Sequence, residues 1–161
     1  MIISRDKSLL FLPFAAIVTE FERRLKAAGF PFYLYMGLRD WQTQDELYAQ
    51  GRTKPGKIVT NARGGDSLHN YGLAVDFVAD GQTEKPGMQW SWDTSIDSDA
   101  DGHSDWMQIG EIGEECGLEW GGRWLRFPDL PHFQKTYGLK LTEMKELYRI
   151  GGIKKVWEAC Q

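Results

Sequence analysis

One histidine and one aspartate near the middle of the chain have the spacing of a metal-binding pair. His69 is followed seven residues later by Asp76, which lies within the apolar run 73–78. A run rich in Val, Ala and Phe is typical of a buried strand, where a carboxylate needs a compensating charge. Histidine is the commonest metal ligand, and Asn70 and Gly72 permit a tight turn between the two side chains.

A second stretch contains the same pair of residue types. Asp129 precedes His132 by three residues, and Pro128 and Pro131 exclude a regular helix here. Two histidines and Asp76 would supply three protein ligands and leave a fourth tetrahedral position for water, which is typical of a catalytic zinc. The alternative is that each histidine is a buried, hydrogen-bonded side chain without a metal.

The two motifs occur in an order that resembles a known family. Ser-x-His-x-x-Gly-x-Ala-x-Asp at 67–76 is followed by Trp-Gly-Gly at 120–122 and Asp-x-Pro-His-Phe at 129–133. This pattern resembles the zinc peptidases of the D-Ala-D-Ala carboxypeptidase type, peptidase M15. Further matches at 37–39 and 47–62 favour the branch of phage endolysins and bacterial L-alanyl-D-glutamate endopeptidases. The resemblance covers roughly residues 3–137.

The resemblance implies a fold and a ligand set. The expected fold is α+β, a small antiparallel sheet with helices packed around it, as in these peptidases and in Hedgehog domains. His69, Asp76 and His132 are the expected zinc ligands. Bound zinc lowers the pKa of water to about 7, so hydroxide forms near neutrality.

The resemblance also assigns roles to four residues around the metal. Asp129 is the expected general base, and its alternative role is to orient His132. Arg39 would stabilise the oxyanion or hold a substrate carboxylate; without the match it would be assigned to a surface ion pair. Ser67 and Gln44 are the expected substrate-binding residues, and the alternative role of Ser67 is to support the metal site.

The implied function is zinc-dependent cleavage of the peptidoglycan stem peptide, most readily at the L-Ala–D-Glu bond. A D-Ala-D-Ala carboxypeptidase or dipeptidase uses the same metal chemistry and is the nearest alternative. A non-catalytic zinc-bearing binding module, as in Hedgehog signalling domains, is an alternative from another class. The segment 52–66, whose basic residues lie between 52 and 63, is either a solvated loop or a binding wall for an acidic stem peptide. Trp90 and Trp92 either stack on substrate or pack in the core.

An acidic segment indicates a second metal site. The spacing matches positions one, three, five, six and nine of an EF-hand calcium loop, with His103 contributing its backbone carbonyl. Position twelve is Gln108 instead of a bidentate Glu, which predicts weak affinity. The alternative is a hydrated loop in which Ser104 or Asp105 caps the next helix. The proposed calcium ligands are Asp97, Asp99, Asp101, His103 and Asp105.

Composition limits the remaining classes. The chain has 161 residues, 42% hydrophobic, which predicts one catalytic domain over 1–161 without a separate wall-binding domain. A net charge of −4 argues against nucleic acid, and Cys116 and Cys160 are expected to be free thiols in a monomer. No signal peptide is recognisable, so we expect cytoplasmic synthesis, no stable membrane association and holin-type release to the wall.

Periodicity and capping residues predict the order of elements. Helices are expected at 14–28, 41–50, 104–116, 142–148 and 153–160, and strands at 32–36, 73–78, 118–120 and 133–137. Asp40 and Thr142 are the expected caps of two of these helices.

Overall fold

The computed structural model describes residues 4–80, 90–91 and 93–161. Its contacts divide the chain into two compact units. Unit 1 comprises 1–12, 36–74 and 136–161, and unit 2 comprises 13–35 and 75–135. Trp92 lies outside the described residues, and so does the side chain of Trp90, so the proposed stacking of these tryptophans stays a prediction.

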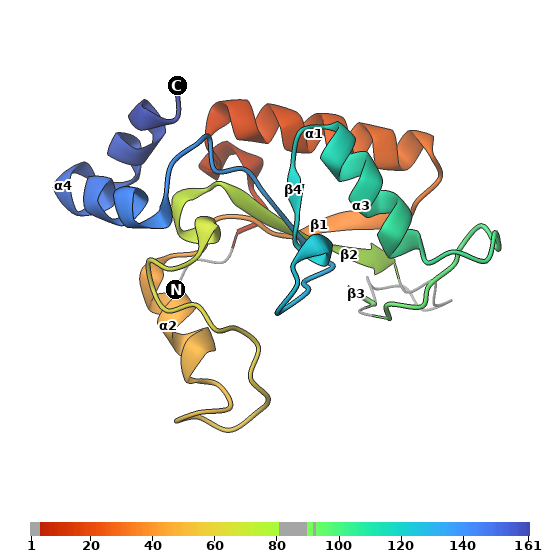
Figure 1. Ribbon diagram of the computed structural model, residues 1–161, viewed down its shortest axis with the longest axis horizontal. Coiled ribbons are helices and arrows are strands. Elements are labelled where there is room, and N and C mark those ends of the chain that lie inside the picture. Colours follow the sequence, from red (N-terminus) through yellow and green to blue (C-terminus); the bar gives the residue numbers. More distant parts are fainter. Residues whose placement is uncertain (1–3, 81–89, 92) are drawn as a thin grey trace. The chain divides into compact units, whose positions relative to one another are not determined.

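Unit 2 contains almost all of a small sheet (Figure 1). The strands are hydrogen-bonded in the order β1-β2-β5-β4, and β3 pairs with β2. The pairings β2–β3 and β4–β5 are antiparallel, and the second places Glu119 opposite Gln134. The strand bounds are β1 Phe32–Met36, β2 Ala74–Asp80, β3 Trp90–Ser91, β4 Glu119–Trp120 and β5 His132–Gln134.

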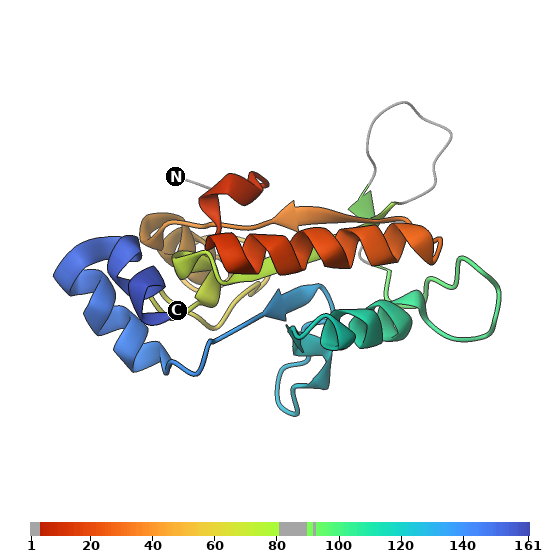
Figure 2. The same cartoon turned by 90° about the horizontal axis from the view of Figure 1, so that it is seen from above.

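Two helices of unit 2, α1 (Leu12–Ala27) and α3 (Asp105–Glu115), pack on this sheet. Figure 2 shows α1 running lengthwise along β1 and β2. The ring of Phe21 in α1 lies 5.0 Å from that of Phe77 in β2 and 4.7 Å from that of Phe133 in β5. These fully buried rings form the core beneath β2 and β5, the strands that carry Asp76 and His132.

Unit 1 contains the 3₁₀ turns η1 (Lys7–Leu9) and η2 (Leu68–Tyr71) with the helices α2 (Trp41–Ala49) and α4 (Leu141–Ala159). α4 is kinked where Gly151 and Gly152 leave helical geometry. It braces η2, because the indole of Trp157 donates a 2.7 Å hydrogen bond to the carbonyl of Tyr71. The turn that carries His69 is therefore held by a distant part of the sequence.

The predicted α+β class with a small antiparallel sheet is confirmed. The strand at 32–36 and the Asp40 cap, which accepts a hydrogen bond from the amide of Thr43 at 2.7 Å, are also confirmed. The Thr142 cap is wrong, because α4 already begins at Leu141 and the Glu143 carboxylate accepts from the amide of Lys140. Strand β5 begins at His132, one residue earlier than predicted.

Two further predictions concern the whole chain. Cys116 and Cys160 are free thiols, as predicted, and burial raises the pKa of Cys160 to about 11. Within the described part of the chain, no helix has the length and apolar character required to cross a bilayer.

Candidate metal centre

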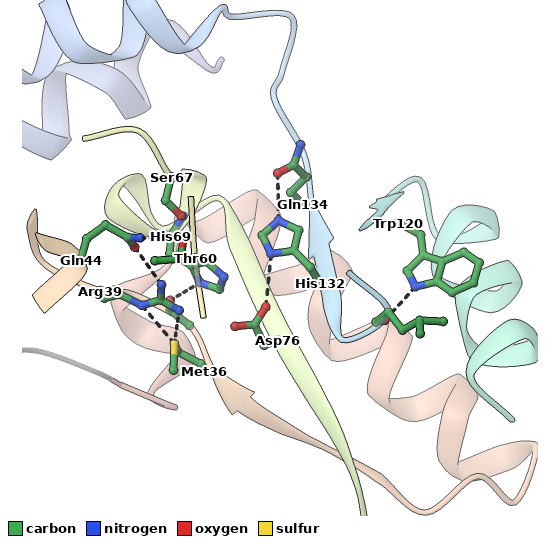
Figure 3. A network of polar contacts seen from close by, with 12 residues as sticks. Met36, Arg39, Gln44, Thr60, Ser67, His69, Asp76, Trp120, His132 and Gln134 are labelled. Atoms are coloured by element: carbon green, nitrogen blue, oxygen red, sulfur yellow. Dashed lines mark hydrogen bonds and ion pairs between the residues drawn. The ribbon is translucent and has the colours of Figure 1, made fainter. Parts of the chain in front are cut away.

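Asp76 and His132 are brought together by neighbouring strands. β2 carries Asp76, β5 begins at His132, and the amide of Phe77 donates to the carbonyl of Pro131 at 3.0 Å. The Nδ1 of His132 lies 3.2 Å from Oδ1 of Asp76 (Figure 3), and the side chains are only 9% and 16% exposed. These two residues are 56 positions apart in the sequence, and the pairing of β2 with β5 brings their side chains into contact.

The surroundings of His132 favour positive charge. Burial lowers the pKa of His132, but the hydrogen bond to Asp76, the charges of Asp76 and Asp129 and a hydrogen bond to Gln134 raise it above the ordinary value overall. The centre therefore attracts a proton or a metal cation, and the two compete for the same imidazole.

His69 is fixed by its turn in unit 1. Ser67 caps η2 and accepts a 3.4 Å hydrogen bond from the amide of His69, and Gly72 ends the turn at φ +66°, which favours glycine. The Nδ1 of His69 lies 2.8 Å from the carbonyl oxygen of Gly37. Since a carbonyl only accepts, Nδ1 carries the proton and Nε2 is the nitrogen that can bind a metal.

The three side chains fit one metal ion. His69, Asp76 and His132 each offer a ligand atom, and these atoms all lie within 4.8 Å of one another. Two ligands of a tetrahedral zinc, with bonds of about 2.0–2.1 Å, lie about 3.3 Å apart. The 3.2 Å between His132 and Asp76 matches that separation. Two imidazoles and a carboxylate are also a donor set that zinc accepts.

Asp129 is held next to His132 by the loop between β4 and β5. Its amide donates to the carbonyl of Gly121 at 3.0 Å, and the amide of His132 donates to the carbonyl of Asp129 at 3.2 Å. A side chain at Gly121 would lie 2.6 Å from that same Asp129 carbonyl. The indole of Trp120 donates to the carbonyl of Leu130 at 2.8 Å. The Trp-Gly-Gly segment therefore permits and fixes the close approach of this loop.

Arg39 and Gln44 form a buried, hydrogen-bonded pair (Figure 3). The guanidinium of Arg39 donates to Oε1 of Gln44 at 2.8 Å and contacts the sulfur of Met36. The amide nitrogen of Gln44 donates to the carbonyl of Ala62 at 2.8 Å and to Oγ1 of Thr60 at 3.3 Å. Gln44 is fully buried, and its amide group is hydrogen-bonded to the protein groups named above.

Asn70 is a buried clamp whose role the sequence did not indicate. Its amide nitrogen donates to the carbonyl of Arg39 at 2.8 Å, and its oxygen accepts from the amide of Gly65 at 2.9 Å. The amide of Arg39 in turn donates to the carbonyl of His69. Asn70 thus ties Arg39 to the histidine turn. An amide directly after a metal-ligand histidine is the available signal for this role, which goes beyond the tight turn that Asn70 permits.

The acidic loop brings together part of the predicted calcium set. Carboxylate oxygens of Asp97, Asp99 and Asp105 lie within 4.8 Å of one another. Asp101 is not in this group, because it accepts from Nε2 of Gln108 at 2.8 Å and from the amide of His103 at 2.8 Å. The calcium set that includes Asp101 therefore stays a prediction.

Ser104 is the N-cap residue of α3, as in the alternative interpretation of this loop. Its hydroxyl, however, donates to the carbonyl of Thr94 at 2.7 Å and makes no capping bond. Asp105 is fully buried and accepts from the amide and hydroxyl of Ser98.

The fold and the centre define a class, an α+β protein with a His-Asp-His group that could hold one metal ion. Residues 60–135 match the family described as D-alanyl-D-alanine carboxypeptidase. The chain is 47% identical, over 122 residues, to the peptidoglycan L-alanyl-D-glutamate endopeptidase CwlK of Bacillus subtilis; these cover 73% of this chain and 71% of CwlK.

A solved structure agrees with the sequence comparison. The L-Ala D-Glu endopeptidase ChiX of Serratia marcescens superposes with a TM-score of 0.54 and 27% identity, over 82% of this chain and 84% of ChiX. The chain belongs to the peptidase M15 family, whose members are metal-dependent peptidases.

Proposed function

We propose that this chain is a zinc-dependent peptidoglycan peptidase that cleaves the stem peptide between L-Ala and D-Glu. The observation that carries the proposal is the group of His69, Asp76 and His132 in a chain 47% identical to an L-alanyl-D-glutamate endopeptidase. The two relatives described above carry this activity in their names. We assign the metal to zinc because the donor set is two imidazoles and one carboxylate.

The protein groups divide the chemistry of hydrolysis among them. Zinc, when bound, acts as a Lewis acid and makes water a better nucleophile near neutrality. Asp129 takes the proton of the attacking water at its carboxylate and returns it to the nitrogen of the leaving amine. The guanidinium of Arg39 holds a substrate carboxylate or the developing oxyanion.

Ser67 and Gln44 serve substrate binding in different ways. Ser67 is half-buried at the start of the histidine turn, where its hydroxyl is beside the backbone of His69. Gln44 acts through Arg39, because its amide oxygen accepts from that guanidinium while its nitrogen is bound to the 60–62 segment. We therefore assign Gln44 to positioning the arginine for an acidic substrate.

The basic segment 52–63 supplies positive charge for the D-Glu carboxylate. The guanidinium carbons of Arg52 and Arg63 lie 4.0 and 4.6 Å from the centre of the Tyr48 ring. Arg52 also donates to the carbonyls of Tyr48 and Thr60 at 2.7 and 3.0 Å. These contacts hold the loop in a defined conformation with its cations at the surface, which suits a wall for an anionic peptide.

The proposed reaction predicts a defined product. Digestion of purified peptidoglycan is expected to release fragments with a new N-terminal D-Glu, identified by mass spectrometry. Treatment with a chelator should abolish cleavage, and stoichiometric zinc should restore it, because three side chains among the described residues could hold one ion. Cleavage that continues after complete metal removal would refute the metal mechanism.

The same digest distinguishes the second candidate. The matching family is described as D-alanyl-D-alanine carboxypeptidase, so release of free D-Ala is the outcome that favours this activity. A non-catalytic zinc-bearing module would bind metal and yield neither product. Arg39 and Asp129 argue for a catalyst, because a binding module has no need of a positioned base.

We also propose that the 97–105 loop binds calcium weakly through Asp97, Asp99 and Asp105. Support comes from the approach of their carboxylates to within 4.8 Å. Partial desolvation and the negative charges of Asp101 and Asp97 raise the pKa of Asp99, as expected for crowded acids. Calcium binding would require Asp101 to leave Gln108 if the fuller predicted set, including the carbonyl of His103, is to form.

Calcium is expected to raise the melting temperature of the chelator-treated protein. At ten times the dissociation constant, one site stabilises the fold by ~1.4 kcal/mol, or about 3–6 °C for a chain of this size. Asp97→Asn should remove the shift, whereas Glu146→Gln on the exposed face of α4 should keep it. No shift at millimolar calcium in the unmodified protein would end the calcium proposal.

Three expectations stay predictions. They are release to the wall through a holin-type pore, as for a phage endolysin, a monomeric state, and the lack of a nucleic-acid partner. Lysis of host cells only when a pore-forming protein is co-expressed would support the first, and light scattering of the purified protein tests the second.

A further inference from the structure

We propose that Gln134 is a positioning residue that holds His132 with its Nδ1 directed at the metal, and that Glu119 and Trp124 hold Gln134 in turn. The inference rests on the zinc centre proposed above and extends it to three residues beyond the ligands. All of the groups involved belong to unit 2.

The register of β4 and β5 places these groups side by side. Gln134 follows His132 by two residues in β5, so both side chains lie on one face of the strand. Its partner across the antiparallel pair is Glu119 in β4. The Nε2 of His132 lies 2.9 Å from Oε1 of Gln134, and Nε2 of Gln134 lies 3.0 Å from Oε1 of Glu119 (Figure 3 shows the contact with His132).

The donors and acceptors of these side chains determine the direction of the hydrogen bonds between them. The indole of Trp124 only donates, and it donates to Oε1 of Glu119 at 3.1 Å. The Glu119 carboxylate only accepts when ionised, so the group of Gln134 facing it must be the NH₂. The amide oxygen of Gln134 therefore faces His132 and requires a proton on Nε2 of that ring.

A proton on Nε2 determines what Nδ1 can do. In the neutral ring with Nε2–H, Nδ1 is an acceptor with its lone pair in the ring plane. It lies 3.2 Å from an oxygen of Asp76, which is also an acceptor. Two acceptors at this distance are stabilised by a cation between them, and the separation suits two ligands of one zinc ion.

The ring of His132 is also restrained from the side. The ring of Trp124 lies 5.0 Å from that of His132 at an angle of 47°. The same tryptophan thus contacts the histidine ring and anchors Glu119, which holds Gln134. His69 shows the equivalent arrangement in its own turn, because the carbonyl of Gly37 there accepts from Nδ1 and leaves Nε2 for the metal.

Gln134→Leu tests the proposal, because leucine keeps the bulk and removes the acceptor. With the zinc dissociation constant measured by chelator competition, Gln134→Leu should bind zinc about 10–100-fold more weakly than the unmodified protein. Imidazole ¹⁵N NMR should show His132 losing its fixed Nε2–H tautomer. Gln42→Leu on the exposed side of α2 is the matched control and should change neither measurement.

A double swap distinguishes polarity from simple packing. In Glu119→Gln with Gln134→Glu, the carboxylate at 134 accepts from Nε2 of His132 and from the new amide at 119, so net charge and direction are preserved. We expect zinc affinity within about threefold of the unmodified protein and the same tautomer. This swap decides the matter if Gln134→Leu fails to fold.

Two results would overturn the proposal. One is unchanged zinc affinity and tautomer in Gln134→Leu. The other is a folded double swap that binds zinc as weakly as the leucine variant. Failure of the unmodified protein to bind zinc would instead refute the metal centre itself, so the two failures are distinguishable.

Discussion

Asp76→Asn is expected to give a folded protein that does not retain zinc and cleaves peptidoglycan at least ~10³-fold more slowly. The loss corresponds to about 4 kcal/mol of transition-state stabilisation, within the range that a metal ion supplies. Asp76 is the only anionic member of the three-residue group. Asparagine has nearly the same shape, so β2 should pack as before, but its neutral oxygen is a poor partner for a cation.

Metal content, folding and activity must be measured together for this variant. Elemental analysis should find substoichiometric zinc, while the circular dichroism spectrum matches that of the unmodified protein. Glu146→Gln is the matched carboxylate-to-amide control, because Glu146 is 67% exposed and only 3.9 Å from Arg149. An Asp76→Asn protein with one zinc per chain and full activity would remove this carboxylate from the ligand set.

Elements with local signals were predicted well from the sequence. The aromatic strand at 32–36 and the Asp40 cap depend on residues within a few positions of each other, and both were correct. The kink of α4 at Gly151 and Gly152 also follows from local conformational freedom. The Thr142 cap was wrong, because the helix begins at Leu141 and the carboxylate of Glu143 accepts from the amide of Lys140.

The partners of buried polar groups could not be predicted in the same way. Gln134 gains its role from the register that sets it opposite Glu119, and no local pattern encodes that register. Gln44 was expected to contact substrate, whereas its burial directs the amide to Arg39 and the 60–62 segment. In the acidic loop, the spacing alone did not reveal that Gln108 would bind Asp101.

The final prediction separates the two roles that the sequence allowed for Asp129. If Asp129 is the general base, Asp129→Asn should lower kcat by about 10²–10⁴-fold and leave the zinc dissociation constant unchanged. If it merely orients His132, the same variant should weaken zinc binding by about 10–100-fold. Zinc competition and single-turnover cleavage of a purified stem-peptide fragment measure the two quantities independently.

The geometry favours the first outcome. The ring nitrogens of His132 lie 3.2 Å from Asp76 and 2.9 Å from Gln134, so these two residues already set the orientation of the ring. The carbonyl of Asp129 accepts a hydrogen bond from the amide of His132, and Gly121 packs closely against Asp129. Glu111→Gln on the exposed face of α3 serves as control. Full activity in Asp129→Asn would exclude Asp129 from proton transfer and require another base within reach of the metal.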